Sequence, residues 1–292
     1  DRCSSFCDYR KMADSLNIIP ISGALGARVN GLNLANRLDL RITNFLKEAL
    51  LKYLVLVFPN QKLTPEDQLK IARKFGRPDI YPFLDGLDGY PEIIEILKTE
   101  KDKINFGVHW HSDTTYMARP NMGTLLYAIE VPRYGGDTLF ANMYKAYDAL
   151  SPGLKSMLHN VKAHYSSAQK NIGGRDAKMK NLTGMKKAYT ESQAIEAIHP
   201  IIRTHPETGR KALYVNFSHT TNFEGMTPEE TLPILRYLTN HAVRPEFTCR
   251  LRWKRGDLVI WDNRCTQHKA INDYQGQRRQ MHRITLKGGR PK

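Results

Sequence analysis

The stretch Phe247-Thr-Cys-Arg-Leu-Arg-Trp253 alternates apolar and polar residues from end to end. Because side chains two apart point to the same face of a strand, this pattern predicts an antiparallel strand with one buried and one exposed face. Short strand-like runs recur around it, as in residues 257–261 and 280–286. Many short strands with few helices and long connections are typical of a mainly β sandwich with flanking helices, and within that class we expect a jelly roll.

Two segments carry the same signal for the start of a helix, namely Thr64-Pro-Glu-Asp67 and Thr227-Pro-Glu-Glu230. Each offers an N-cap threonine, a proline at the first helical position and acidic residues in the first turn. They predict helices that end near Gly76 and His241, and apolar periodicity predicts a third helix over 38–53. Further strands are expected at 18–29 (a pair), 53–58, 93–97, 109–113, 124–129, 137–140, 197–203 and 211–216, and short helices at 144–150 and 152–161.

The chain of 292 residues shows no repeat, low-complexity block or linker, and we expect a single domain over residues 12–292. Residues 1–11 are polar and irregular, and we interpret them as a disordered tail or as vector or upstream residues. No apolar run approaches the roughly 18 to 20 residues that a membrane span needs, so no membrane partner is expected. Four scattered cysteines are too few for a disulfide framework and indicate free thiols in a cytoplasmic protein.

The charge is strongly positive, with 44 basic against 29 acidic residues and a net value of +15. Such a balance suggests either nucleic acid or small anions as partners. Basic residues concentrate in 151–190 and 278–292, but no zinc finger or RNA-binding aromatic strand accompanies them. We therefore expect a small anionic ligand and no nucleic acid. Residues 166–190 have little periodicity and are expected to form a mobile basic lid over the site.

The stretch Val108-His-Trp-His-Ser-Asp113 places His111 and Asp113 two residues apart, so an extended segment would point both to one face. An imidazole and a carboxylate are two of the three ligands in the two-histidine, one-carboxylate iron site. His268, which follows the apolar strand 258–261, is a candidate third ligand because a closed sheet would bring the two strand ends together. His109 shares the face of His111 and is a rival ligand.

Other histidines have no partner at ligand spacing, and we interpret His199, His205 and His282 as structural. The run Trp261-Asp-Asn-Arg264 is expected to order a turn through hydrogen bonds and is given no catalytic role.

Seven motifs, taken in their order and spacing, resemble the taurine and aryloxyalkanoate dioxygenase family over about residues 18–287. They are Trp110-His-Ser-Asp113, Gly135-Gly-Asp-Thr138, Ala146-Tyr-Asp-Ala-Leu-Ser151, Thr204-His-Pro206, Trp261-Asp-Asn-Arg264, Thr266-Gln-His268 and Gln277-Arg-Arg-Gln-Met-His-Arg283. The resemblance implies a double-stranded β-helix, that is, a cupin-like jelly roll. It also implies Fe(II) held by His111, Asp113 and His268, with 2-oxoglutarate as co-substrate, O2 as oxidant and His109 as a neighbour of the metal.

The resemblance also implies residues for the co-substrate and the substrate. Arg279 matches the family's arginine for the far carboxylate of 2-oxoglutarate, and Thr138 matches its hydroxyl partner. Arg283 matches the position that holds the sulfonate in taurine-cleaving members, and on a strand it shares a face with Arg279. Tyr81 stands where those members have a sulfonate-binding histidine, and His219 stands where they have a pocket phenylalanine. We expect both to contact the substrate.

The expected reaction is hydroxylation of a small anion, with succinate and CO2 as co-products. The substrate could be a sulfonate such as taurine or a relative, a sulfate ester or an aryloxyalkanoate. Tyr81 and Leu84 depart from the taurine-cleaving pattern, so we expect slow turnover of taurine or none. A homo-oligomer, either a dimer or a tetramer, is also expected. The alternatives are a zinc-dependent hydrolase, since zinc accepts the same ligands, and a catalytically silent binding protein on the same scaffold.

Overall fold

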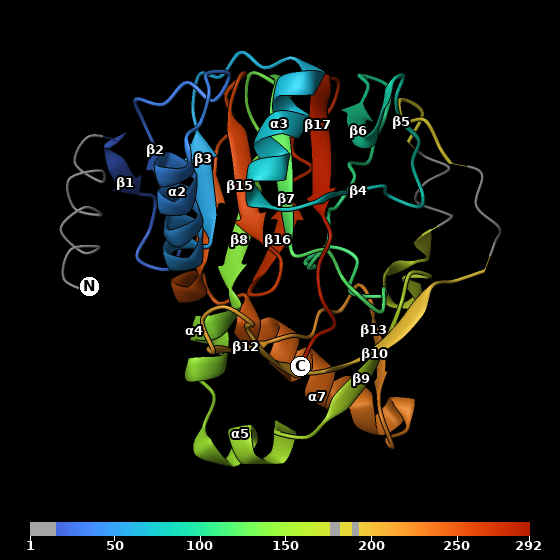
Figure 1. Ribbon diagram of the computed structural model, residues 1–292. Helices are drawn as coiled ribbons and strands as arrows, with labels where there is room; N and C mark the ends of the chain where they lie inside the picture. Colours follow the sequence, from blue (N-terminus) through green and yellow to red (C-terminus); the bar gives the residue numbers. More distant parts are fainter. Residues whose placement is uncertain (1–15, 176–181, 189–192) are drawn as a thin grey trace, which may run out of the picture.

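The computed structural model describes residues 16–175, 182–188 and 193–292, and a nine-stranded sheet forms its upper half (Figure 1). The central pairs are antiparallel, whereas β2 and β3 run parallel. Along the main path the strands are β1 (Ile18–Pro20), β2 (Ala27–Val29), β3 (Val55–Phe58), β15 (Leu258–Asp262), β7 (Gly123–Glu130), β17 (Arg279–Leu286), β6 (Tyr90–Lys98) and β5 (Gly86–Leu87), and β4 (Pro78–Asp79) pairs with β17.

A second sheet of three strands has the order β14 (Thr248–Leu251), β8 (Thr138–Asn142) and β16 (Thr266–Ala270). Its inner face meets the large sheet, and the rings of Phe140 and Trp261 pack edge to face with their centroids 5.4 Å apart. Strands that neighbour each other here lie far apart in the sequence, as β15 between β3 and β7 shows. Two facing sheets with such crossovers form the predicted jelly roll, and the fold class is confirmed.

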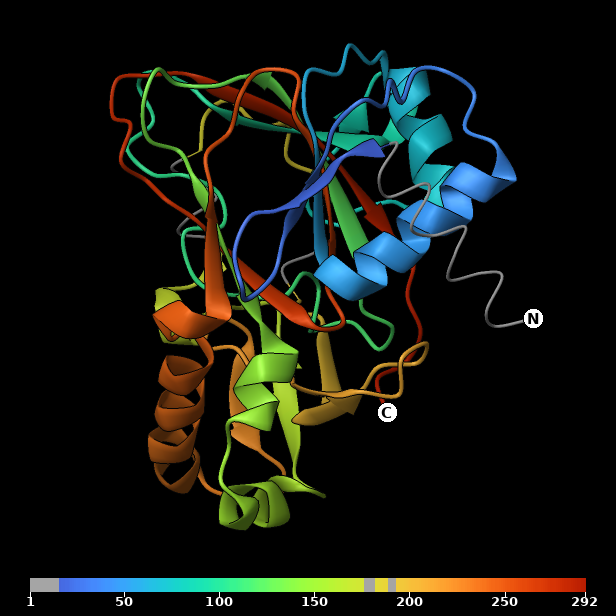
Figure 2. The same cartoon turned by 90° about the vertical axis from the view of Figure 1, so that its left-hand side faces the viewer.

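Alternation along β15 assigns its side chains to two cores. Val259 and Trp261 lie in the core between the sheets, whereas Leu258 and Ile260 lie in the core under two helices. These helices, α2 (Leu40–Tyr53) and α3 (Pro65–Phe75), cover the same outer side of the large sheet (Figure 2). The predicted N-cap at Thr64 is present and forms a capping box with Asp67, and the helices predicted over 38–53 and from Thr64 are confirmed.

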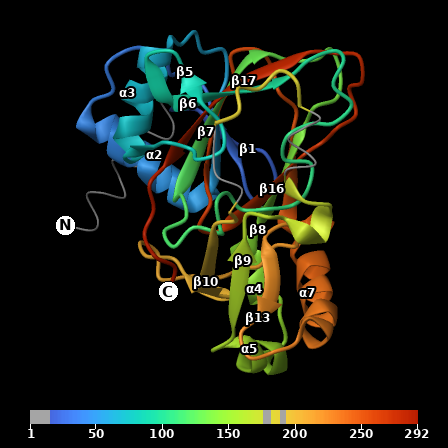
Figure 3. The ribbon, with the colours of Figure 1, turned by 90° about the vertical axis from the view of Figure 1, so that its right-hand side faces the viewer.

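Residues 143–175 and 193–247 form a third part below the two sheets (Figure 3). A small sheet of order β10-β9-β13 packs there with α7, whose predicted N-cap at Thr227 is present and forms a capping box with Glu230. The elements are α4 (Met143–Asp148), α5 (Pro152–Leu158), β9 (Lys162–Ser166), η1 (Lys170–Ile172), β10 (Glu196–Pro200), β11 (Ile202–Thr204), β12 (Lys211–Leu213), β13 (Thr220–Phe223), α7 (Pro228–Ala242) and η2 (Pro245–Phe247).

The structure corrects several expected elements. Residues 109–113 do not form a strand: they make one isolated bridge, between His111 and His268, before the chain turns. The expected strand 197–203 is divided into β10 and β11, because the chain leaves one sheet at Pro200 and joins a hairpin. The strands β9, β13 and β16 were not expected. Polar residues dominate β13 and β16, so their sequences carry little apolar alternation.

Some expectations concern parts that the structure does not describe. The tail 1–11 lies outside the described residues, as do 176–181 and 189–190 of the expected lid. One domain over 12–292 and a homo-oligomer both stay predictions. In the described ranges, no helix is both long and apolar enough to cross a lipid bilayer.

Candidate active site

The three predicted metal ligands converge between the two sheets. His111 and His268 are tied by a pair of backbone hydrogen bonds, 3.1 Å from His111 N to His268 O and 2.8 Å in return. Asp113 Oδ1 lies 3.7 Å from His111 Nε2 and 3.8 Å from His268 Nε2. One ligand atom from each residue falls within 4.8 Å of the others. This separation lets a single metal ion contact all three side chains.

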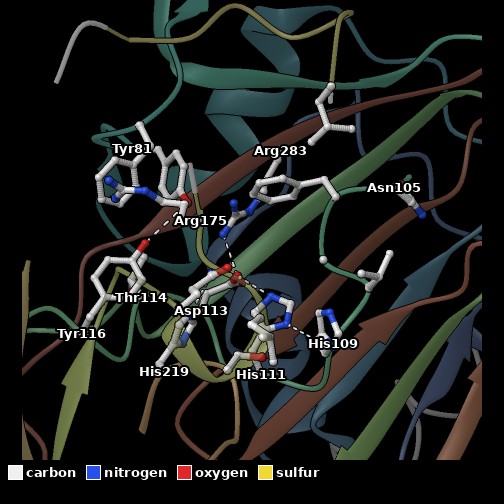
Figure 4. A pocket seen from close by; sticks show the side chains of 18 residues that line it. Tyr81, Asn105, His109, His111, Asp113, Thr114, Tyr116, Arg175, His219 and Arg283 are labelled. Carbon is white, nitrogen blue, oxygen red and sulfur yellow. Dashed lines mark hydrogen bonds and ion pairs between the residues drawn. The ribbon is translucent and has the colours of Figure 1, made fainter. Parts of the chain in front are cut away.

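The orientation of His111 is set by its neighbour His109. His111 Nδ1 lies 2.7 Å from the backbone carbonyl oxygen of His109, which can only accept a hydrogen bond (Figure 4). The proton therefore sits on Nδ1, and the lone pair of Nε2 points toward Asp113 and His268. His109 thus contributes its backbone carbonyl here, and its ring is not part of the ligand cluster.

The two carboxylate oxygens of Asp113 have different partners. Thr124 Oγ1 donates to Oδ2 over 2.7 Å, and Arg283 Nη2 donates to Oδ1 over the same distance. The backbone N–H of Asp113 donates to Asn263 Oδ1 over 3.3 Å, and Asn263 Nδ2 in turn donates to the Thr124 hydroxyl over 2.8 Å. These contacts hold the carboxylate in one orientation before any metal binds.

The electrostatics suit metal binding. Burial alone would raise the pKa of Asp113, but the Arg283 guanidinium and the two histidines outweigh it and hold the pKa below its usual range. Burial and the neighbouring His111 lower the pKa of His268 to about 3. At neutral pH, Asp113 is therefore ionised and His268 is neutral, which are the forms in which these side chains bind metals.

Two cavities meet at these ligands, and both are lined by His111, Asp113 and Arg283. We call them the Tyr81 cavity and the Arg279 cavity. Further lining of the Tyr81 cavity comes from Tyr81, Phe83, Tyr116, Arg175, Leu182 and His219 (Figure 4). Further lining of the Arg279 cavity comes from Ile96, Leu126, Thr138, Trp261, His268 and Arg279.

Hydrogen bonds organise the wall of the Tyr81 cavity. The Tyr116 hydroxyl donates to the Tyr81 hydroxyl over 3.4 Å, and burial keeps the pKa of Tyr116 well above its usual value. Both ring nitrogens of His219 have protein partners, Thr115 Oγ1 at 2.8 Å and Gln169 Nε2 at 3.2 Å. His219 is therefore held as a fixed ring surface beside Tyr116, with the ring centroids 5.0 Å apart.

The Arg279 cavity ends in a buried guanidinium. Arg279 is 3% exposed, and its Nε and Nη2 have no hydrogen-bond partner. The Trp253 indole lies beside it, 5.7 Å from the guanidinium carbon to the ring centroid, and donates from Nε1 to Thr138 Oγ1 over 2.9 Å. Buried N–H groups without an acceptor favour an anion at this end of the cavity.

Several residues of the site were not predicted. Tyr116 and Arg175 line the Tyr81 cavity. Arg175 and Leu182 belong to the two described parts of the segment 166–190, so both parts reach this cavity. Thr124 lies on a strand whose apolar neighbours gave no sign of function. Asn263 lies within a motif that was interpreted as ordering a turn.

That turn interpretation is correct for the neighbours of Asn263. Asp262 accepts hydrogen bonds from the backbone and guanidinium of Arg264 and from His205 Nε2. His205, Asp262 and Cys265 also bring one ligand atom each within 4.8 Å of the others. His205 Nδ1 accepts from the backbone N–H groups of Glu207 and Thr208, and its Nε2 donates to Asp262, so neither ring nitrogen is left for a metal and we interpret this cluster as structural. His199 and His282 likewise contact Met117 O and Gln68 Oε1 and lie outside the metal-ligand cluster.

Comparison with known proteins identifies the family of this chain. Residues 17–285 match the family model described as "Taurine catabolism dioxygenase TauD, TfdA family". The chain is 34% identical to an alkylsulfatase of Acinetobacter baylyi over 276 residues, covering 94% of this chain and 85% of that protein. It is 34% identical to an (S)-phenoxypropionate/alpha-ketoglutarate-dioxygenase of Sphingobium herbicidovorans, covering 89% and 90% of the two chains.

Among solved structures, a taurine dioxygenase from Burkholderia xenovorans superposes with a TM-score of 0.80 at 32% identity, covering 95% of this chain and 91% of that one. The family model spans most of the chain, and the relatives match over nearly the full length of both partners. This chain belongs to the TauD/TfdA family of dioxygenases.

Proposed function

We propose that His111, Asp113 and His268 hold Fe(II), that 2-oxoglutarate binds in the Arg279 cavity, and that a small anionic substrate binds in the Tyr81 cavity. The observation that carries this proposal is the meeting of the two cavities at His111 and Asp113, with His268 on the side of the Arg279 cavity. A reaction that couples two substrates at one metal needs such an arrangement, because both must reach the same ion from different sides.

The residues present fit the metal and the co-substrate. Two imidazoles and one carboxylate are the donor set of the non-haem Fe(II) oxygenases. Bound Fe(II), together with 2-oxoglutarate and O2, supplies the oxidising power for hydroxylation, and 2-oxoglutarate leaves as succinate and CO2. The chain contributes the ionised Asp113 and the fixed tautomer of His111.

Arg279 would bind the far carboxylate of 2-oxoglutarate. Its two N–H groups without acceptors match the two oxygens of a carboxylate, and such charge-assisted pairs are among the stronger hydrogen bonds in proteins. Thr138 lines the same cavity, and the Trp253 N–H to its oxygen leaves the hydroxyl proton free to donate. The relative from Sphingobium herbicidovorans, whose name includes alpha-ketoglutarate, supports this co-substrate.

The Tyr81 cavity favours an anion with an apolar tail. Arg283 Nη1 is buried without a partner, and the Tyr81 hydroxyl accepts from Tyr116 and keeps its own proton for a ligand. Phe83, Ile172 and Leu182 line the rest. Among the described lining residues, Asp113 is the sole acid and already pairs with Arg283, so the ammonium group of an aminosulfonate such as taurine finds no carboxylate there.

An alkyl sulfate ester is the substrate class that we propose, and the alkylsulfatase among the relatives supports it. Insertion of one oxygen atom into the C–H bond of the carbon that carries the ester oxygen would give a hydroxylated ester. Its C–O bond to the sulfate then breaks as the new hydroxyl loses its proton, and the products are an aldehyde and hydrogen sulfate. The second oxygen atom of O2 ends in succinate.

A panel of three substrates tests this proposal. Purified protein with Fe(II), 2-oxoglutarate and air is offered hexyl sulfate, taurine or phenoxyacetate, and sulfate with hexanal, sulfite or phenol is measured beside succinate. We expect hexyl sulfate to be turned over fastest. Taurine turnover with kcat/KM above about 10⁴ M⁻¹s⁻¹ would contradict the substrate class. Product release with zinc and without 2-oxoglutarate would instead support a hydrolase.

A further inference from the structure

Lys98, at the end of β6, is a buried lysine without an acceptor. The residue is 2% exposed, and its Nζ has no hydrogen-bond partner. The Tyr274 ring lies below the ammonium group, with Nζ 4.7 Å from the ring centroid. A buried ammonium group is costly unless an anion or several acceptors surround it, and a ring face compensates only part of that cost.

Lys98 lies directly opposite Arg279 in the antiparallel pairing of β6 and β17. Opposed residues of such a pair share one face of the sheet, and here it is the face of Ile96 and Met281, which lies in the core between the two sheets. Two buried cations therefore stand side by side on this face, and Arg279 lines the Arg279 cavity. Neither forms an ion pair with a carboxylate of the described residues.

The nearest buried acid along the chain, Asp102, is already hydrogen-bonded elsewhere. Asp102 is buried, and its Oδ2 accepts hydrogen bonds from the backbone N–H and the hydroxyl of Thr99. Its Oδ1 accepts from the backbone N–H and the hydroxyl of Thr183. Asp102 thus ties the strand end to the segment at Thr183 and does not neutralise Lys98 directly.

The buried polar atoms around Lys98 that lack partners are mostly donors. Besides Lys98 Nζ they include Arg279 Nε and Nη2 and the Tyr274 hydroxyl. Buried polar groups in folded proteins are nearly always paired, so a cluster of unmet donors implies a missing acceptor. With two positive charges present, the acceptor must be an anion, and a carboxylate offers two oxygens for several donors.

We propose that Lys98 is a second cation for the far carboxylate of 2-oxoglutarate, beside Arg279. This inference rests on the proposed co-substrate and adds a residue to its binding site. Arg279 presents a planar pair of N–H groups, and Lys98 adds a point charge from the neighbouring strand. Without a ligand the two buried cations repel each other, and this repulsion lowers the stability of the ligand-free protein. The carboxylate of the bound ligand offsets that repulsion.

The test combines two ligands with one substitution. Binding of 2-oxoglutarate and of 2-oxovalerate, which lacks the far carboxylate, is measured on the Fe(II)-loaded protein without O2, by calorimetry and by the metal-to-ligand absorption band. Lys98→Met should raise the Kd of 2-oxoglutarate roughly tenfold or more, as expected for loss of a charged hydrogen-bond donor. It should leave the Kd of 2-oxovalerate within about twofold. Lys98→Gln, which keeps a polar side chain, is the second variant and should show the same selective loss.

Lys254→Met is the matched control, because Lys254 is exposed and lies next to Trp253, so it removes the same charge outside the cavity. It should change neither Kd. Equal weakening of both ligands by Lys98→Met, or no weakening of 2-oxoglutarate, would overturn the inference. If wild-type protein binds no 2-oxoglutarate while it binds Fe(II), the proposed co-substrate itself is wrong, so the two failures are distinguishable.

A stability measurement separates this role from a structural one. Removing a buried, unpaired charge should raise the melting temperature of ligand-free Lys98→Met above that of wild type. The rise in melting temperature on adding 2-oxoglutarate should be smaller in the variant than in wild type, since ligand stabilisation follows affinity. A lower melting temperature of the ligand-free variant would show that Lys98 stabilises the fold and would count against the proposal.

Discussion

At the scale of single residues, the two carboxylate oxygens of Asp113 make different contacts. Oδ1 points at both histidines and also accepts a hydrogen bond from Arg283. Oδ2 accepts a hydrogen bond from the hydroxyl of Thr124. A carboxylate on a freely rotating side chain would lose orientational entropy on binding a metal. Thr124 and Asn263 have already removed that freedom, so they are positioning residues for the metal site.

The metal ligands are expected to be indispensable and His109 to be replaceable. His111→Ala, Asp113→Ala and His268→Ala should each abolish Fe(II) binding and succinate formation, because three ligands are the minimum for this site. His109→Ala should keep Fe(II), since the contribution of His109 to His111 is a backbone carbonyl. Metal content by mass spectrometry and circular dichroism for folding check both. Loss of metal in His109→Ala with retention in His111→Ala would reverse the ligand assignment.

The positioning role of Thr124 is tested by Thr124→Val, which keeps the shape and removes the hydroxyl. We expect metal affinity to fall by roughly 10- to 100-fold, as is typical when a partner of a metal ligand is lost. Thr285→Val is the control, because Thr285 is buried and pairs with Thr124 across β7 and β17. Mn(II) titration monitored by calorimetry gives both affinities. The same loss in the two variants would show a general packing effect.

At the scale of elements, β17 joins the two cores of the molecule. Its residues Arg279 and Arg283 line the cavities and Met281 lies in the core between the sheets, while Ile284 and Leu286 lie in the core under α2 and α3. A slip of one residue in register would turn both arginines away from the site. The helix α3 packs against the outer side of this strand, and Gln68 on the helix contacts His282 Nδ1 at 3.2 Å.

The capping box of α3 is therefore expected to affect stability without affecting the site. Thr64→Ala removes the hydroxyl that accepts from the Asp67 backbone N–H and should cost about 1 kcal/mol of unfolding free energy. Thr64→Ser keeps an N-cap hydroxyl and should lose less. Urea denaturation gives the free energies, and 2-oxoglutarate affinity should stay unchanged because α3 lies on the opposite face of the sheet. A change in that affinity would show that α3 supports the site directly.

At the scale of the whole molecule, buried histidines link stability to pH. Burial lowers the pKa of His199, which is 1% exposed. The hydrogen bond to the Met117 carbonyl raises this pKa in part, and the charge of Arg203 lowers it again. Burial likewise lowers the pKa of His282. Below the unfolded value of about 6.5, the unfolded chain binds these protons and the folded chain does not. Their contribution to stability is therefore present above pH 6.5 and is lost as the pH falls from there.

We expect the melting temperature to decline as the pH falls from 7.5 to 5.5. Each such histidine changes the unfolding free energy by at most about 1.4 kcal/mol per pH unit. His199→Gln should flatten the decline, whereas His159→Gln, at an exposed position, should leave its slope as in wild type. Thermal melts followed by circular dichroism at four pH values give the slopes. An unchanged slope in His199→Gln would contradict this assignment.

The sequence alone determined the features that depend on neighbours along the chain. N-caps at Thr64 and Thr227 and the alternation over 247–253 reflect local geometry, and α3, α7 and β14 formed where those signals predicted them. Family motifs supported the jelly roll expected from the short strands and added the enzyme class, which the family match confirms. Local signals failed where pairing is made by distant residues, as in β13 and β16, whose polar sequences form strands because β9 and β8 offer them free edges.

Only the tertiary structure decided how the site is assembled. Asp113, Thr124, Asn263 and Arg283 are spread over 170 residues, and their hydrogen bonds exist because the two sheets close around them. The pairing of Lys98 with Arg279 depends on the register of β6 against β17. No spacing along the chain encodes that register. It follows from burying the apolar side chains of both strands at once, and this packing places two buried cations opposite each other, one of which lines the cavity.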